Sequence, residues 1–170
     1  MKKILVILFE EIGDDVAIVK PINSGASLKI SIDYVLRGDK TETLLTSGLY
    51  CVPEHALEQM NNTKESWCKT DGRQFKHFVQ SFHKDENVTA DLIHSIGIKF
   101  AEKMFPGFEV IISTHKDTDH CHTHFIVNSV NLETGLKIQN SYHDLDFIFS
   151  KSSSQGIFRT TSRMGCQPCS

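Results

Sequence analysis

Histidines gather in one short stretch of this sequence, and their spacing suits a metal site. Of nine histidines, four fall within ten positions: His115, His120, His122 and His124. His122 and His124 are two residues apart and run directly into an apolar segment, so on a β-strand both imidazoles project from the same face. His115 ends the preceding apolar segment, and the residues between are few enough to form the loop of an antiparallel hairpin. The hairpin would bring the three imidazoles together.

Three converging imidazoles predict a catalytic metal site. Neutral nitrogen ligands at about 2.1 Å suit a transition ion and leave it positively charged, with open positions for a substrate. Asp117 and Asp119 lie in the predicted hairpin loop, where either can accept the second N–H of a ligand histidine. His120 lies in the predicted hairpin loop, and we expect it to contact a ligand or face the substrate, not to bind the metal. The alternative is a histidine-rich surface loop, but a loop needs no two-residue spacing within an apolar strand.

The elements that must position these residues mix strands and helices without the regular alternation of a parallel sheet. We expect strands over about 16–20, 44–51, 74–82, 108–114, 122–130 and 136–139, and helices over about 24–37, 53–62 and 89–104. The sequence therefore predicts an α+β fold with a mainly antiparallel β-sheet flanked by helices.

Two of the predicted helices have a clear apolar face. In the first helix this face consists of Leu28, Ile32 and Val35, and Tyr34 lies off it in the last turn. In the third helix the apolar face is built from Leu92, Ile93, Ile96, Phe100 and Met104. Tyr34 is therefore able to point away from the centre of the core.

Length and composition indicate a single globular domain. The chain has 170 residues, 39% hydrophobic and 23% charged, and no apolar run long enough to span a membrane. The first nine residues resemble a short signal peptide, but acidic residues follow where a cleavage site should lie. The five cysteines, an odd number, argue against a disulfide scaffold. We therefore expect a cytoplasmic protein without membrane insertion.

The charge balance counts against a nucleic-acid partner, because phosphate contacts usually demand a basic surface. The formal net charge is −3. Acidic residues are concentrated between positions 10 and 15, however, and a bound divalent cation would add positive charge at the site itself.

The chain divides into three parts by composition. Residues 1–15 are expected to form an N-terminal extension or an extra strand, and residues 16–150 the main domain. Residues 151–170 are rich in serine and threonine without apolar periodicity, which is typical of a disordered or frame-shifted tail.

Three segments carry a resemblance to a known family. The stretch His115-Lys-Asp-Thr-Asp-His-Cys-His-Thr-His-Phe-Ile-Val-Asn128 resembles the third motif of relaxase/mobilization nucleases, the histidine-hydrophobe-histidine single-strand endonucleases. Ile32-Asp-Tyr-Val-Leu-Arg37 is similar to their first motif, in which a tyrosine near a helix end is the nucleophile. His77-Phe-Val-Gln-Ser-Phe82 resembles the strand before their third helix, and Leu45-Thr-Ser-Gly48 a strand containing Ser-Gly. The likeness runs from about Val16 to Asp146 and implies a relaxase-like fold.

The resemblance implies metal-dependent, strand-specific nicking of single-stranded DNA at a transfer origin, in plasmid or conjugative-element mobilization. Tyr34 would attack a phosphodiester and form a 5′-phosphotyrosyl link, with manganese or magnesium as the metal and an accessory mobilization protein as a further partner. Tyr50 competes with Tyr34 as the nucleophile, whereas Tyr142 has only its chemistry in its favour. Candidate phosphate contacts, for each of which a solvated charge is the alternative, are Arg37, Lys40 and Lys76.

Relaxases of this type usually continue beyond the third motif, so we expect residues 16–150 to be a C-terminally incomplete nicking domain. Two alternatives follow. The chain is a non-catalytic DNA-binding remnant of a relaxase, or it is a three-histidine metallohydrolase in which water attacks instead of Tyr34.

Overall fold

The computed structural model describes residues 5–8, 16–23, 25–39, 41, 45–82, 88–116 and 121–138. The chain divides into two compact units, Met1–Lys137 and Ile138–Ser170, and all the helices and strands below belong to the first. Among the described residues, no helix has both the length and the apolar character needed to cross a membrane.

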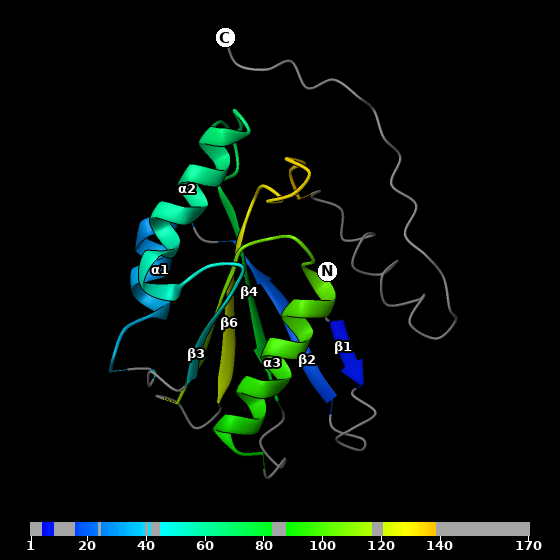
Figure 1. Cartoon of the computed structure of the whole chain (residues 1–170). Helices are drawn as coiled ribbons and strands as arrows, with labels where there is room; N and C mark the ends of the chain where they lie inside the picture. Colours follow the sequence, from blue (N-terminus) through cyan, green and yellow to red (C-terminus); the bar gives the residue numbers. More distant parts are fainter. Residues whose placement is uncertain are drawn as a thin grey trace, which may run out of the picture. The chain divides into compact units, whose positions relative to one another are not determined.

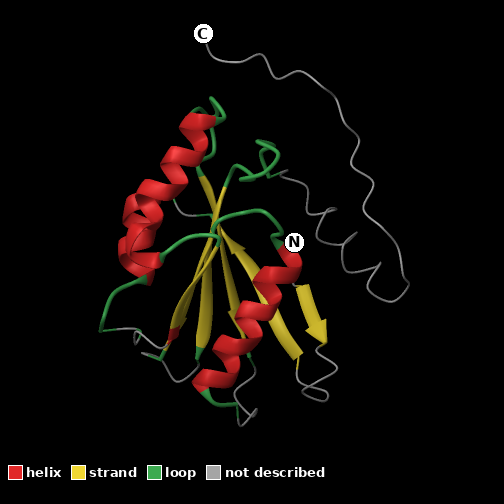
Figure 2. Cartoon of the chain, in the orientation of Figure 1, coloured by secondary structure: helices red, strands yellow, loops and turns green. Residues whose placement is uncertain are grey.

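A six-stranded antiparallel sheet forms the centre of the first unit (Figures 1 and 2). Its strands follow the order β1-β2-β4-β6-β5-β3, and every neighbouring pair is antiparallel. The strands are β1 (Leu5–Leu8), β2 (Val16–Ile22), β3 (Thr46–Leu49), β4 (Phe75–Ser81), β5 (Val110–His115) and β6 (His122–Asn128). The predicted α+β fold with a mainly antiparallel sheet is confirmed.

Helices cover both faces of the sheet. On one face, α1 (Leu28–Val35) and α2 (Ala56–Ser66), the latter preceded by the 3-10 helix η2 (Pro53–His55), pack on Ile111 and Ile126. Because side chains alternate along a strand, the neighbouring residues of β5 and β6 point to the opposite face, where α3 (Ala90–Met104) packs against β5, β6 and β3. Figure 1 shows α1 and α2 side by side and α3 across the sheet.

Capping and apolar periodicity explain where α1 and α3 lie. The Ser27 hydroxyl accepts a hydrogen bond from the Ile30 amide, and the Thr89 hydroxyl accepts one from the Leu92 amide. The predicted apolar face of α1 is buried, as are four of the five residues predicted for α3. The prediction is wrong for Leu92, which is 41% exposed, because it precedes Ile93 directly and so lies about 100° away from that face.

Element boundaries differ from the predictions at several places. The first helix begins at Leu28, three residues after Gly25, and the second continues to Ser66. The strand predicted over 136–139 is absent from the described part of that range, which contributes only an isolated bridge between Val130 and Lys137. The side-chain oxygen of Asn131 instead accepts two backbone amides of the intervening turn, which favours the turn over a longer ladder.

Within residues 1–15, the part that the structure describes is the edge strand β1. Cys51 and Cys121 are free thiols.

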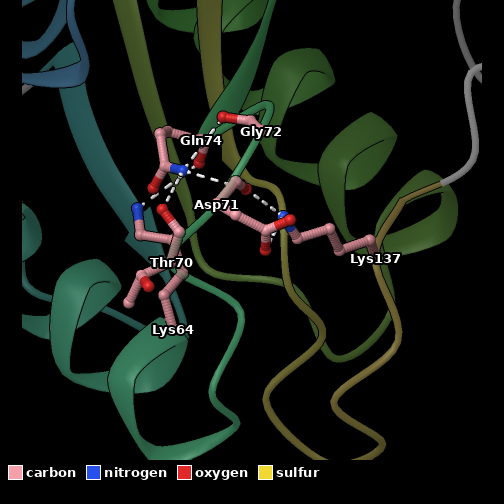
Figure 3. A network of polar contacts seen from close by, with 6 residues as sticks. All are labelled: Lys64, Thr70, Asp71, Gly72, Gln74 and Lys137. Carbon is pink, nitrogen blue, oxygen red and sulfur yellow. Dashed lines mark hydrogen bonds and ion pairs between the residues drawn. The ribbon is translucent and has the colours of Figure 1, made fainter.

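A polar network fixes the loop between α2 and β4 (Figure 3). The side-chain amide of Gln74 donates to three carbonyls of the loop, those of Thr70, Asp71 and Gly72. The Lys64 ammonium, buried at the end of α2, donates to the Gln74 carbonyl, and burial lowers the pKa of Lys64 to about 8. Lys137 donates to the Asp71 carbonyl across the loop. The network therefore anchors the start of β4, the strand that carries His77.

Candidate active site

The β5–β6 hairpin brings His115, His122 and His124 together. His115 is the register partner of His122, and His124 follows on the same face of β6. One ring nitrogen of each histidine lies within 4.8 Å of those of the other two. The ring centroids of His115 and His124 are 4.4 Å apart, and both side chains are buried, whereas His122 is half-buried. Three imidazoles at these separations form a donor set suited to one transition-metal ion.

The rings of His115 and His124 are each oriented by a contact to a group outside the three-histidine cluster. The Nε2 atom of His115 lies 3.0 Å from the Val35 carbonyl, which can only accept a hydrogen bond, so this nitrogen carries the proton. The Nδ1 atom of His124 lies 2.9 Å from Nε2 of His77. The other nitrogens of these rings, Nδ1 of His115 and Nε2 of His124, are buried and hydrogen-bonded to no group in the described part of the chain. A metal ion held by these two nitrogens would satisfy both.

His77, on β4, is the residue of this site that sequence reasoning missed. It is buried on the same face as the three other histidines, and burial together with the charge of His115 lowers the pKa of His77 to about 4. The imidazole is therefore neutral near pH 7. The two-residue spacing predicts that the side chains of Phe75, His77 and Val79 share one face of a strand. Nothing in a single sequence indicates, however, that this strand pairs with β6 and so brings His77 to the other histidines.

Tyr34 extends from the last turn of α1 toward the histidines. Its ring centroid lies 5.8 Å from that of His115 and 5.7 Å from that of His124, both in edge-on contacts, and the residue is 40% exposed. The end of α1 is fixed to β5, because the Val35 carbonyl accepts from Ser113 Oγ at 2.6 Å as well as from His115. Tyr34 is therefore held beside the histidines while part of its surface stays open.

Three further predicted site residues lie in the described part of the chain. Arg37 is exposed and donates both Nε and a terminal nitrogen to the Asp39 carboxylate. Lys76 lines a cavity of about 710 Å³ together with Arg73 and His77. Tyr50, 52% exposed, lies in the turn after β3. The predicted residues that lie outside the described residues are Lys40, Asp117, Asp119, His120 and Tyr142.

Comparison with known proteins agrees with the resemblance in the motifs. A family model described as "Relaxase: MobA/VirD2-like, nuclease domain" matches residues 34–153, which is more than half of the chain. A curated relative, "Protein rlx" of Staphylococcus aureus, is 42% identical over 102 residues, which cover 60% of this chain and 32% of that protein. The "Group II intron-interrupted relaxase LtrB" of Lactococcus lactis subsp. cremoris (strain MG1363) is 45% identical over 60 residues, 35% of this chain and 11% of that protein.

The chain therefore spans about a third of the length of its Staphylococcus aureus relative. No solved structure matches it. The motifs, the antiparallel α+β sheet and the extent of the family match give one answer: the chain belongs to the family of MobA/VirD2-like relaxase nuclease domains.

Proposed function

We propose that this chain nicks one DNA strand at a transfer origin by tyrosine transesterification, in the mobilization of a plasmid or conjugative element. The observation that carries the proposal is the placement of Tyr34, whose partly exposed ring contacts two of the three clustered histidines. A nucleophile beside a candidate metal site and open to solvent is what attack on a bulky polymeric substrate requires.

In the proposed reaction Tyr34 Oη attacks the phosphorus of the scissile phosphodiester. The Oη–P bond forms while the bond from phosphorus to the 3′ oxygen breaks, and the phenolic proton is balanced by protonation of that leaving oxygen. The products are a 5′-phosphotyrosyl link and a 3′-hydroxyl. A phenolate is a better leaving group than an alkoxide, so the covalent link conserves the bond for later rejoining.

The residues that would hold a divalent metal ion are His115, His122 and His124. When bound, the ion would supply Lewis-acid stabilisation to the non-bridging oxygens of the phosphate. Imidazole ligands favour manganese or another transition ion over magnesium, which prefers oxygen. The buried positions of His115 and His124 keep the ligand rings rigid, and half-buried His122 marks the side from which a substrate would approach.

Single-stranded DNA is the proposed substrate. Lys76 and Arg73 line the same cavity as His77, and both are candidate phosphate contacts. The net charge of −3 suggests that few phosphates are neutralised, so we expect a shallow salt dependence of binding. An accessory mobilization protein would then be needed to melt the duplex and to add affinity.

The test is a denaturing gel of labelled single strands from the transfer origin, incubated with the protein and manganese. We expect a slowly migrating covalent adduct that disappears with a chelator and in Tyr34→Phe, but persists in the matched control Tyr50→Phe. An adduct that persists in Tyr34→Phe and disappears in Tyr50→Phe would move the nucleophile to Tyr50.

Two other outcomes would replace the proposal. Cleavage without an adduct would select hydrolysis by water. Binding of single strands that survives the chelator, without any cleavage, would select a non-catalytic DNA-binding remnant.

A further inference from the structure

We infer that His77 is a positioning residue for the metal centre: it accepts the Nδ1–H of His124 and thereby presents Nε2 of His124 as the ligand atom. The inference rests on the proposed metal site. It assigns a role to a fourth histidine, on a different strand from the three candidate ligands.

His77 Nε2 and His124 Nδ1 are 2.9 Å apart, so one of the two nitrogens donates and the other accepts. If His124 were the acceptor, its own proton would sit on Nε2. That nitrogen is buried and makes no hydrogen bond within the described residues, so an N–H group there would be desolvated without compensation. Donation from His124 Nδ1 to His77 avoids this cost.

The proton of the neighbouring His115 is also fixed, by a different acceptor. His115 donates Nε2–H to the Val35 carbonyl, which leaves Nδ1 as its basic nitrogen. The two basic nitrogens, Nδ1 of His115 and Nε2 of His124, are thus selected by two neutral acceptors. Ligand histidines commonly donate to carboxylates, whose negative charge offsets that of the ion. A neutral imidazole acceptor instead leaves the full positive charge of the centre to act on a phosphate.

The surroundings of His77 suit a rigid acceptor. It is 6% exposed, lies in the middle of β4, and its ring is tilted 47° to that of His124 at a centroid distance of 5.0 Å. The start of β4 is anchored by the Gln74 network a few residues away (Figure 3). Little freedom remains for the His77 ring to move away from His124.

The experiment measures metal binding by calorimetry, with Mn²⁺ or Co²⁺ and tag-free protein. In His77→Phe, which keeps the ring and removes the acceptor, we expect metal affinity to fall by roughly 10- to 100-fold. In His77→Gln, whose side-chain oxygen can accept the same hydrogen bond, most of that affinity should return. His94→Gln alters a buried histidine on the other face of the sheet and should leave affinity unchanged.

Folding and protonation are measured separately. Thermal unfolding without metal identifies any variant that loses affinity merely by unfolding. Nitrogen-15 NMR of the metal-free wild-type protein reports the proton position on His124, which we expect on Nδ1.

Three results would overturn the inference: equal metal affinity in His77→Phe and wild type, loss of affinity in His77→Gln as large as in His77→Phe, or a His124 proton on Nε2. Absence of metal binding by the wild type would overturn the proposed metal site as well. Metal binding that depends on His77 in a chain that forms no DNA adduct would uphold the inference and contradict only the nicking function.

Discussion

Buried histidines lie on both faces of the sheet, and their partners differ. On the α3 face, His94 is hydrogen-bonded through both ring nitrogens, to Ser47 Oγ at 2.9 Å and to Thr114 Oγ1 at 3.0 Å. Thr114 in turn contacts Thr123 Oγ1 at 2.9 Å. On the opposite face, one ring nitrogen of His115 and one of His124 is hydrogen-bonded, and the other is buried without a hydrogen bond to any described group.

Hydroxyl groups account for the difference. A hydroxyl can donate or accept as its neighbour requires, so a histidine surrounded by serine and threonine is satisfied in either tautomer. A carbonyl can only accept, so the Val35 carbonyl fixes one tautomer of His115 and leaves the lone pair of its other nitrogen directed elsewhere. The proposed donation from His124 to His77 would do the same for His124. Burial alone therefore does not distinguish a structural histidine from a ligand, whereas the chemistry of the partners does.

The largest effect that would test this comparison is loss of a proposed metal ligand on the α1 face. Metal binding by a site of this kind is worth several kcal/mol per ligand, so His124→Ala should lower Mn²⁺ or Co²⁺ affinity by roughly 10³-fold. The matched variant on the other face, His94→Ala, should change metal affinity by less than about threefold. His94 bonds to Ser47 and Thr114 and not to the three histidines, and substitutions at separate sites usually act independently. Calorimetric titration measures both, and equal losses in the two variants would contradict the distinction between the faces.

A second substitution breaks the hydroxyl network. Thr114→Val keeps the shape of the side chain but removes the group shared by His94 and Thr123. We expect a loss of about 2 kcal/mol in the free energy of unfolding, because two buried polar groups lose a partner. Urea unfolding measures the loss, and Ser47→Ala, which removes a single contact at the edge of the network, should cost less. If Thr114→Val were as stable as the wild type but bound metal more weakly, the α3 face would be the one that supports metal binding, and the comparison would be wrong.

The pH dependence of stability tests the α3 face in a different way. Burial lowers the pKa of His94 below its usual 6.5, although the nearby Asp91 carboxylate opposes the shift. The unfolded chain therefore takes up the proton first, so this contribution to stability is complete above pH 6.5 and declines as the pH falls below it. For one proton the slope is at most about 1.4 kcal/mol per pH unit. His94→Gln should have a flatter stability profile below pH 6.5, and an unchanged profile would show that His94 does not titrate there.

The smallest predicted effect concerns the connection between α1 and β5. Ser113→Ala removes the Oγ–H donor to Val35, but His115 still bonds the same carbonyl. We expect a loss of about 1 kcal/mol in the free energy of unfolding. DNA adduct formation should fall more than metal affinity, because the altered contact holds the helix of Tyr34, whereas His115 keeps its own hydrogen bond to the Val35 carbonyl. A variant that loses metal affinity and adduct formation equally would contradict this separation.

The sequence predicts the three-histidine cluster because its geometry is local. A hairpin and a two-residue spacing are enough to place His115 beside His122 and His124, and helical periodicity places Tyr34 off the apolar face of α1. The contacts of His77 and of the Val35 carbonyl depend on which strands pair and on where α1 ends. Those are long-range features, with sequence separations of 47 and 80 residues, and one sequence carries no signal for them.

The same limit explains the errors in the fold. Leu92 fitted a broad apolar face in the sequence, but the narrow contact between α3 and the sheet leaves it exposed. The segment after Gly135 has the alternating pattern of a strand but pairs with no strand within the described residues. It therefore forms only the single bridge between Val130 and Lys137.

The acceptor that orients His115 belongs to the main chain, and this has an evolutionary consequence. Any residue at position 35 presents the same carbonyl, so substitutions there can accumulate without altering the proton on His115. Selection on this contact would instead be recorded in the donors, His115 and Ser113, and in whatever keeps α1 ending at this turn. Sequence alignments of relatives would accordingly show a histidine with no co-varying partner, although the partner is present in every copy.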